Sequence, residues 1–432
     1  MFVSDCLDVN EKGHLTIGGV DTTEIAKEYG TPVIVYDEDS IRKNCRAFVN
    51  SMDEYYGGNG RVLYANKAFS CLEMCRIAND EKMGLDVVSG GEIYTALKAG
   101  FPAEKLYFHG NNKSYDELEY ALKNSVGRII VDNSDELMRI SEIASKLGVT
   151  ADIFMRIKPG IDAHTHDFIK TGQIDCKFGF ALETGEAMEY VKLAIATENV
   201  NLRGLHCHIG SQIFDIDPFV LAAEVMMNFY AEIKKETGVV LTELDLGGGF
   251  GIRYSEKDSP VGFDAYMNPV SAKIKEIAQA NDMPVPFVLI EPGRSIAGAE
   301  AVTLYTIGNI KKIPDVRTYV AVDGGMTDNP RYILYQAEYT AMCANKADKP
   351  RDTKVTIAGK CCESGDLIQE NTMIQDVEAG DILAVLSTGA YNYSMSSNYN
   401  RLLRPAVLMV KDGNVRTIIR RETYEDVVRN DL

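Results

Sequence analysis

The stretch Val62-Leu63-Tyr64-Ala65-Asn66-Lys67-Ala68 begins as a short apolar run and then turns into a longer segment. A short run of apolar and β-branched residues before a turn is typical of a buried strand. Runs of this kind return up to residue 290: Leu85-Asp86-Val87-Val88, Leu106-Tyr107-Phe108, Ile129-Ile130-Val131, Ile153-Phe154-Met155-Arg156-Ile157, Leu202-Arg203-Gly204-Leu205, Leu244-Asp245-Leu246 and Phe287-Val288-Leu289-Ile290.

The segments between these eight runs carry apolar residues three and four positions apart, which predicts helices. The segments are residues 116–123, 134–147, 186–196, 219–235 and 264–280. Eight strands, each followed by a helix, close most naturally into a TIM barrel with its active site at the C-terminal ends of the strands. We therefore predict an α/β fold with a (β/α)8 barrel over residues 38–300.

After residue 300 the pattern changes to strand-like runs without long helices, at 302–307, 318–322, 354–358, 382–386, 406–410 and 415–418. The first 37 residues add two short runs, 14–17 and 33–36, around a small predicted helix at 24–29. We expect residues 1–37 and 301–432 to form one β domain.

Composition excludes several classes of partner. The chain has 432 residues, with 63 acidic and 45 basic side chains and a net charge of −18, and this charge argues against nucleic-acid binding. The sequence lacks an apolar run near the roughly 18–20 residues of a membrane helix. The start of the chain does not resemble a secretory signal, and the nine cysteines have no paired spacing. We expect a cytoplasmic protein with free thiols.

Lys67 follows the first predicted strand. A lysine at the mouth of a barrel can be desolvated, which lowers its pKa and frees its amine for Schiff-base chemistry. A solvated surface charge is the ordinary alternative.

Two further strands end in groups that suit an anionic ring compound. The run Gly247-Gly248-Gly249-Phe250-Gly251 follows the seventh strand, where barrels often bind phosphate; a tight turn is the alternative. Its spacing does not match the G-x-G-x-x-G pattern of dinucleotide-binding folds. The eighth strand ends in Glu291-Pro292-Gly293-Arg294. The acid could pair with a protonated ring nitrogen and the arginine with a carboxylate or phosphate, unless the two form an ordinary salt bridge.

The sixth strand ends in His206-Cys207-His208-Ile209-Gly210-Ser211-Gln212. Alternation along a strand places His206 and His208 on one face, so metal ligation, with help from His164 and His166, is one interpretation. Packed core histidines are another. An imidazole stacked on a planar cofactor, with Ser211 bonding the phosphate, is the interpretation that we favour, and we predict no metal site.

Together the strand ends offer an amine, an acid, a stacking ring and a phosphate cradle, which are the groups that pyridoxal 5′-phosphate needs. The sequence then resembles the diaminopimelate decarboxylase family, which shares its fold group with ornithine decarboxylase and alanine racemase. The resemblance runs nearly end to end. Beyond the motifs already quoted it includes Asp162-Ala163-His164-Thr165-His166, Lys177-Phe178-Gly179-Phe180, Cys362-Glu363-Ser364-Gly365-Asp366, Gly389-Ala390-Tyr391 and Met395-Ser396-Ser397-Asn398-Tyr399-Asn400.

The resemblance implies a role for each matching residue. Lys67 would bind the pyridoxal phosphate, His208 would stack on its ring and Glu291 would pair with the ring nitrogen. The phosphate would be bound by Ser211, Gly248, Gly249, Gly293, Arg294 and Tyr391. The substrate would be bound by Arg294, Arg331, Tyr335, Glu363 and Tyr391. Cys362, the proton donor, and Glu363, which would hold the distal ammonium, would come from the second subunit of a homodimer.

One segment departs from the family pattern. The stretch Gly325-Met326-Thr327-Asp328-Asn329-Pro330-Arg331 has Thr327 and Asn329-Pro330 where the family usually shows Asn and an apolar pair. The positions of Arg331 and Tyr335 are kept, although the loop before them could differ in shape. Cys361 is likewise unusual for the family and is interpreted as packing.

The implied reaction is decarboxylation of meso-2,6-diaminopimelate to L-lysine. The nearest alternative is a decarboxylase of a polyamine precursor such as carboxynorspermidine, or of another basic amino acid, which would not need Arg331 to bind a carboxylate. A racemase would not need Cys362 and Glu363. A catalytically silent relative and a metal-dependent barrel hydrolase are the remaining alternatives.

Overall fold

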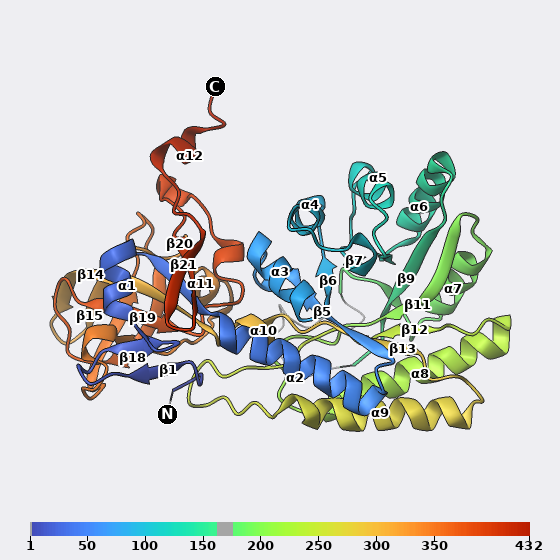
Figure 1. The fold of residues 1–432 in the computed structure, drawn as a ribbon, viewed down its shortest axis with the longest axis horizontal. Coiled ribbons are helices and arrows are strands. Elements are labelled where there is room, and N and C mark those ends of the chain that lie inside the picture. The colour runs from blue at the N-terminus through green and yellow to red at the C-terminus, as the bar shows by residue number, and fades with distance from the viewer. Residues whose placement is uncertain (1, 162–175) are drawn as a thin grey trace. The chain divides into compact units, whose positions relative to one another are not determined.

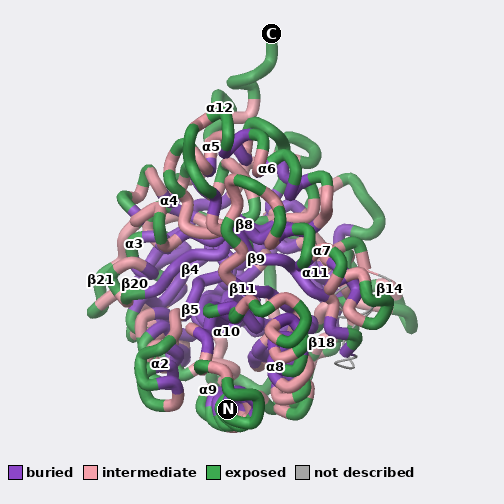
Figure 2. The backbone as a smooth tube through the Cα atoms, turned by 90° about the vertical axis from the view of Figure 1, so that its right-hand side faces the viewer, coloured by how far each residue is buried: buried purple, intermediate pink, exposed green. Residues whose placement is uncertain are grey.

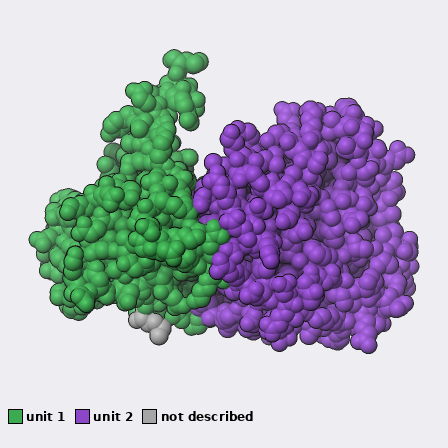
Figure 3. Space-filling view, in the orientation of Figure 1, with its two compact units in different colours: residues 1–44, 252–259, 294–432 green, residues 45–251, 260–293 purple. Residues whose placement is uncertain are grey.

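The computed structural model describes residues 2–161 and 176–432, which form two compact units. We call residues 45–251 and 260–293 the barrel unit, and residues 1–44, 252–259 and 294–432 the β unit (Figure 3). This division differs from the expected limits of 38–300, because residues 38–44, 252–259 and 294–300 group with the β unit.

The barrel unit contains eight parallel strands that pair in a closed ring (Figure 1). Each strand pairs with the next, and the last pairs with the first through Val288 and Gly60. The predicted barrel is therefore confirmed. The strands are β5 (Gly60–Ala65), β6 (Gly84–Val87), β7 (Leu106–Phe108), β8 (Arg128–Val131), β9 (Ala151–Lys158), β11 (Val200–His206), β12 (Glu243–Asp245) and β13 (Phe287–Ile290), with the short β10 (Phe180–Ala181) beside β9.

Helices follow the strands, and the five helices predicted for the barrel are all present. They are α5 (Tyr115–Lys123), α6 (Ser134–Leu147), α7 (Glu186–Ala196), α8 (Asp217–Thr237) and α9 (Phe263–Ala280). The helices α3 (Leu72–Asp80) and α4 (Gly90–Lys98) were not predicted, and α2 (Glu38–Tyr56) crosses the division between the units. Polar caps fix several helix starts: Ser114 accepts the N–H of Glu117, and Asn133 accepts that of Glu136.

The interior of the barrel is filled by side chains from several strands. Leu63, Tyr107, Ile130, Phe154 and Leu289 form one buried cluster. Figure 2 shows the strands β8 and β9 largely buried while α5 and α6 carry exposed faces. Burying a side chain of this size contributes about 1.5–3 kcal/mol, so the packed interior keeps the strand ends in fixed places.

The β unit is built on a nine-stranded sheet and a small three-stranded sheet. The large sheet runs β18 (Leu367–Ile374), β17 (Thr353–Ala358), β15 (Arg317–Val322), β14 (Ala301–Ile313), β4 (Val33–Asp37), β20 (Ala406–Lys411) and β21 (Asn414–Ile419), with β19 (Ile382–Leu386) and β16 (Ala341–Cys343) joined through β14. The small sheet is β1 (Leu7–Val9), β2 (Leu15–Ile17) and β3 (Val20–Asp21).

The N-terminal strands belong with the C-terminal ones. β4 lies between β14, to which it is antiparallel, and β20, to which it is parallel. The unit also has four helices, α1 (Thr22–Tyr29), α10 (Arg294–Ala297), α11 (Arg331–Tyr335) and α12 (Tyr424–Val428). Single 3₁₀ turns lie at Asn66–Ala68 and Ala103–Lys105 in the barrel unit, and at Ala344–Lys346, Tyr393–Met395 and Tyr399–Arg401 in the β unit.

The helices of the described residues were compared with the requirements of a membrane span. Across residues 2–161 and 176–432, no helix combines the length and the apolar character that a bilayer-spanning segment requires.

Candidate active site

The predicted barrel residues lie where the strands end. Lys67 follows β5, His206 ends β11 with His208 two residues on, the glycines follow β12, and Glu291 follows β13. Because neighbouring parallel strands end at the same edge, the barrel gathers these groups at its C-terminal mouth.

Lys67 faces a buried carboxylate. Its Nζ lies 3.4 Å from Oδ2 of Asp86, near the end of β6, and the lysine side chain is 42% exposed while that of Asp86 is 1% exposed. The lysine is therefore only partly desolvated, which lies between the two interpretations that the sequence left open. Its amine is accessible and held near one acidic partner.

Glu291 is the centre of a buried polar cluster. Its carboxylate oxygens lie 2.9 Å from Nε2 of His109, which follows β7, and 3.4 Å from Nε2 of His206. Burial alone would raise the pKa of Glu291, but the two facing imidazoles hold its pKa well below its usual value. Burial and the charge of Glu291 raise the pKa of Asp245 well above its usual value. Negative charge in this cluster is therefore favoured on Glu291 over Asp245.

The histidines of β11 are neutral. Burial lowers the pKa of His206 to about 3. Burial and the nearby charge of Lys67 lower the pKa of His208 well below its usual value. The N–H of Gly248 donates to Nδ1 of His208 at 3.1 Å, which leaves the proton of the neutral ring on Nε2. His208 thus presents an uncharged, oriented imidazole.

The glycines after β12 are required by close packing between loops. A Cβ at Gly248 would lie 2.2 Å from the carbonyl oxygen of Glu291, and one at Gly249 would lie 2.7 Å from that of Gly210. Gly249 also has a φ of +111°, which favours glycine. The tight turn and the phosphate cradle are therefore compatible, because the turn brings the loops after β11, β12 and β13 together.

A second cluster, within the β unit, contains two buried arginines among tyrosines. Arg331 donates to the Tyr339 hydroxyl at 2.7 Å, and its guanidinium carbon lies 5.9 Å from the centre of the Tyr391 ring. The guanidinium carbon of Arg294 lies 4.8 Å from the centre of the same ring. No carboxylate of a described residue is within ion-pair distance of Arg331. Two buried guanidiniums are an arrangement that binds a carboxylate or phosphate.

Tyr254 joins the two arginines. Its hydroxyl accepts a hydrogen bond from Arg294, and its ring centre lies 5.2 Å from the guanidinium carbon of Arg331. Burial alone would raise the pKa of Tyr254, but Arg294 and Arg331 hold its pKa below its usual value. The lowered pKa of Tyr254 therefore reflects the positive charge of the two arginines beside it.

The remaining predicted residues lie in two segments of the β unit. Tyr335 ends α11 and is half-buried, whereas Cys362 and Glu363 are exposed in the turn between β17 and β18. Asn400 holds this turn, since its Oδ1 accepts the N–H of Cys362 at 2.8 Å.

Five residues of these clusters were missed as site residues by sequence reasoning. Asp86, His109 and Asp245 carry a signal that could have found them, because His109 directly follows a predicted strand and Asp86 and Asp245 are the acidic residues within two others. Tyr254 and Tyr339 carry none, since each lies in a segment that no motif marked. The stretch Asp162-Ala163-His164-Thr165-His166 lies outside the described residues.

The metal interpretation paired the wrong histidines. The structure places His206 with His109 and Glu291, whose possible ligand atoms lie within 4.8 Å of one another, rather than with His208. The same Glu291 carboxylate suits a protonated ring nitrogen, so a metal and the pyridoxal ring would compete for it.

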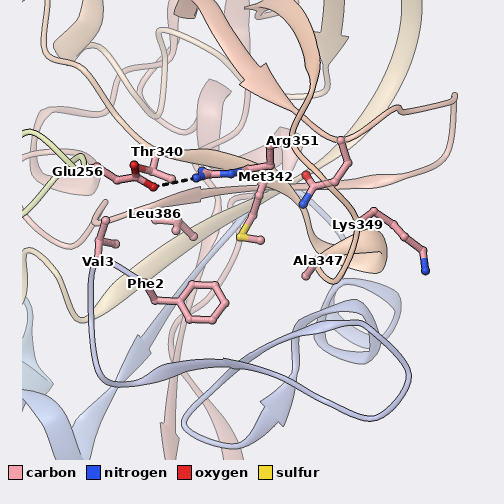
Figure 4. Close-up of a pocket in the computed structure, with 10 residues that line it drawn as sticks. Phe2, Val3, Glu256, Thr340, Met342, Ala347, Lys349, Arg351 and Leu386 are labelled. Carbon is pink, nitrogen blue, oxygen red and sulfur yellow. Dashed lines mark hydrogen bonds and ion pairs between the residues drawn. The ribbon is translucent and has the colours of Figure 1, made fainter.

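A separate cavity of about 260 Å³ lies within the β unit (Figure 4). Phe2, Met342 and Leu386 line its apolar part, and an ion pair of Arg351 with Glu256 lies on its other side. None of the predicted site residues lines it, and we do not assign it to the reaction.

Known proteins resemble the chain over its whole length. Residues 38–298 match the family model described as "Pyridoxal-dependent decarboxylase, pyridoxal binding domain". The chain is 48% identical to diaminopimelate decarboxylase of Bacillus subtilis, covering 100% of this chain and 98% of the relative, and 50% identical to that of Bacillus methanolicus, covering 98% of each. A crystal structure of diaminopimelate decarboxylase from M. jannaschii in complex with L-lysine matches with a TM-score of 0.93 and 34% identity, over 100% and 99% of the two chains.

Proposed function

The chain belongs to the diaminopimelate decarboxylase family of pyridoxal-dependent enzymes, and on this premise we propose how its residues carry the reaction. The reaction removes a carboxylate of meso-2,6-diaminopimelate as CO₂ and leaves L-lysine, which is the last step of lysine biosynthesis. The observation that carries the assignment of roles is the buried Glu291 carboxylate, which lies 2.9 Å from Nε2 of His109 and 3.4 Å from Nε2 of His206 at a barrel mouth that also presents the Lys67 amine.

The barrel residues fit pyridoxal 5′-phosphate. The accessible Lys67 amine suits the aldehyde, Glu291 suits the ring nitrogen and the neutral His208 suits a ring face. The phosphate is assigned to Ser211, Gly248, Gly249, Gly293, Arg294 and Tyr391. When bound, the cofactor supplies an electron sink for the electrons of the broken carbon–carbon bond.

Glu291 and His208 have distinct tasks in this proposal. The carboxylate of Glu291 would keep a proton on the ring nitrogen, because loss of that proton would leave the buried carboxylate without a positive partner. The lowered pKa of His208 makes its imidazole a weak base, so it does not compete for that proton. The hydrogen bond from the N–H of Gly248 fixes the orientation of its ring. Glu291 thus serves to keep the ring nitrogen of the cofactor protonated, and His208 serves to orient the cofactor ring.

The substrate is assigned to residues of the β unit. Arg331, Tyr335, Arg294 and Tyr391 bind carboxylate oxygens, and Glu363 binds the distal ammonium. Cys362 then delivers a proton from its Sγ to the carbon that lost the carboxylate. A substrate with an amino-acid group at each end satisfies both demands, whereas one without a distal carboxylate leaves the buried Arg331 without an anion.

We also propose that the enzyme is a homodimer in which Cys362 and Glu363 serve the partner subunit. Both residues are exposed in the turn between β17 and β18, which supports this proposal, because exposed side chains are free to reach the active site of a second subunit. We place the enzyme in the cytoplasm, and the nine cysteines, all of them among the described residues and none in a disulfide, support a reducing compartment.

The test is product formation by the purified holoenzyme. It is offered meso-diaminopimelate, ornithine, arginine and carboxynorspermidine separately, with Lys67→Ala as the inactive variant and the exposed Lys98→Ala as the matched control. We expect lysine from diaminopimelate alone, and none from Lys67→Ala. Turnover of carboxynorspermidine instead would contradict the role of Arg331, and stoichiometric zinc without a chromophore would favour the metal-dependent alternative.

A further inference from the structure

Asp366 has no role in the reaction described so far, although it closes the motif that begins at Cys362. Its side chain lies in the β unit, and the residue is 2% exposed. Its two carboxylate oxygens accept hydrogen bonds from two different loops: Oδ1 from the N–H of Met326 at 2.6 Å and Oδ2 from that of Cys361 at 2.7 Å. One buried carboxylate therefore ties two loops together.

The two loops are neighbours because of the sheet. β15 and β17 are parallel, with Ala321 opposite Ala358, so the chain leaves both strands at the same edge. The loop after β15, residues 323–330, leads directly to Arg331. The turn after β17, residues 359–366, carries Cys362 and Glu363.

Backbone contacts reinforce this tie. The N–H of Lys360 donates to the carbonyl of Gly324 at 3.0 Å, and that of Gly359 donates to the carbonyl of Asp366 at 2.9 Å. Irregular loops have few regular hydrogen bonds to fix them, so bonds to a charged acceptor have a large share in setting their conformation.

The space around the carboxylate is shaped by two glycines. A Cβ at Gly325 would lie 2.4 Å from Oδ1 of Asp366, and one at Gly359 would lie 2.2 Å from Oδ2. Any larger residue at either position would displace the carboxylate. One of these glycines belongs to each loop, so both loops are built to admit Asp366.

We propose that Asp366 is a positioning residue that sets the substrate contact of Arg331 and the proton delivery of Cys362 together. The inference rests on the proposed function, because it takes the roles of Arg331 and Cys362 from there. Asp366 itself touches neither substrate nor cofactor. Because Cys362 is proposed to serve the partner subunit, this carboxylate joins a substrate-binding element of one active site to the proton donor of the other.

The test compares Asp366→Asn with Asp381→Asn in the holoenzyme. Asp381 is a buried carboxylate of the same unit, bonded to Asn345, Lys346 and the N–H of Glu378, and is therefore the matched control. Asparagine at 366 keeps one acceptor oxygen, so one of the two loops faces an N–H₂ group instead. We expect Asp366→Asn to raise KM for meso-diaminopimelate about tenfold and to lower kcat about tenfold, with a larger solvent deuterium effect on kcat.

Two further measurements separate positioning from folding. Amide hydrogen exchange should quicken in both 323–331 and 359–366 of Asp366→Asn, while the absorbance of the bound cofactor and the Tm stay near the wild-type values. Gly359→Ala, which displaces the carboxylate and keeps its charge, should change KM and kcat in the same direction.

Either of two results would overturn the inference. One is a folded Asp366→Asn enzyme with wild-type KM and kcat. The other is a loss of activity that follows a fall in Tm and is matched by Asp381→Asn, which would make Asp366 merely structural. A wild-type enzyme that forms no lysine would instead refute the proposed function, so the two failures are distinguishable.

Discussion

At the scale of single residues, the site depends on which buried acid keeps its charge. Glu291 and Asp245 are both buried at the barrel mouth, and the charge of Glu291 disfavours ionisation of Asp245. The imidazoles of His109 and His206 face Glu291, so the negative charge settles there. A pyridine nitrogen placed against Glu291 would therefore stay protonated.

Glu291→Gln tests this assignment. Glutamine keeps the shape of the side chain but cannot hold a proton on the ring nitrogen, so we expect kcat to fall by about 10²–10³. The cofactor should stay attached through Lys67, which its absorbance reports. Glu300→Gln, at a buried carboxyl of the β unit, is the control and should keep kcat within a factor of about two. A Glu291→Gln enzyme with normal kcat would contradict the assignment.

The sequence predicted some of these residues and not others for a physical reason. Lys67 and Glu291 follow recognisable strands, so the rule that barrels work at strand ends finds them. The partnership of Glu291 with His109 depends on how β7 and β13 face each other across a closed barrel, which periodicity along the chain does not specify. The exposure of Lys67 is likewise set by its neighbours in space.

At the scale of elements, the sequence predicted all eight barrel strands but missed some strands of the β unit, among them β16 and β18. β18 has the sequence Leu-Ile-Gln-Glu-Asn-Thr-Met-Ile. Its four central residues are polar and give no strand signal, and the strand is stabilised by its pairing with β17. α3 and α4 have nine residues each and were not predicted, whereas α5, which has the same length, was predicted, so length alone does not explain the omission. Tertiary pairing, rather than local propensity, decides such elements.

The start of α2 is held to the β20–β21 hairpin by one buried acid. Glu38 is 1% exposed and accepts hydrogen bonds from Arg42 at 2.7 Å, from Lys411 at 2.9 Å and from Arg416. Burial alone would raise the pKa of Glu38, but these cations lower it from 4.5 to about 2. Folding therefore favours the ionised form, and this contribution to stability is present above pH 4.5 and is lost as pH falls toward 2.

Glu38→Gln should accordingly lower the free energy of unfolding by about 2 kcal/mol at pH 7. This figure is smaller than the pKa shift alone implies, because Lys411 and Arg416 are partly exposed and solvent screens their charges. The free energy of unfolding in urea measures this. The difference from the wild type should shrink as pH is lowered from 4.5 toward 2, because the wild-type carboxylate is then protonated too. A difference that stayed constant over that range would contradict the electrostatic explanation. Glu28→Gln, at the exposed end of α1, is the control.

At the scale of the whole molecule, the proposed homodimer makes a prediction that neither unit makes alone. Lys67→Ala and Cys362→Ala should each abolish turnover. If Lys67 and Cys362 act on the same substrate from different subunits, a hybrid dimer of the two variants contains one site with both residues and one with neither.

Mixing the two inactive variants should therefore restore activity. After subunit exchange in mild urea, random pairing makes half of the dimers hybrids, so about a quarter of the wild-type activity should return. Lys67→Ala mixed with the double variant is the control and should restore none, because no combination of those chains supplies Lys67. If both residues instead acted within one subunit, every subunit in the mixture would lack one of them, and the activity would stay at zero whether or not the chains paired.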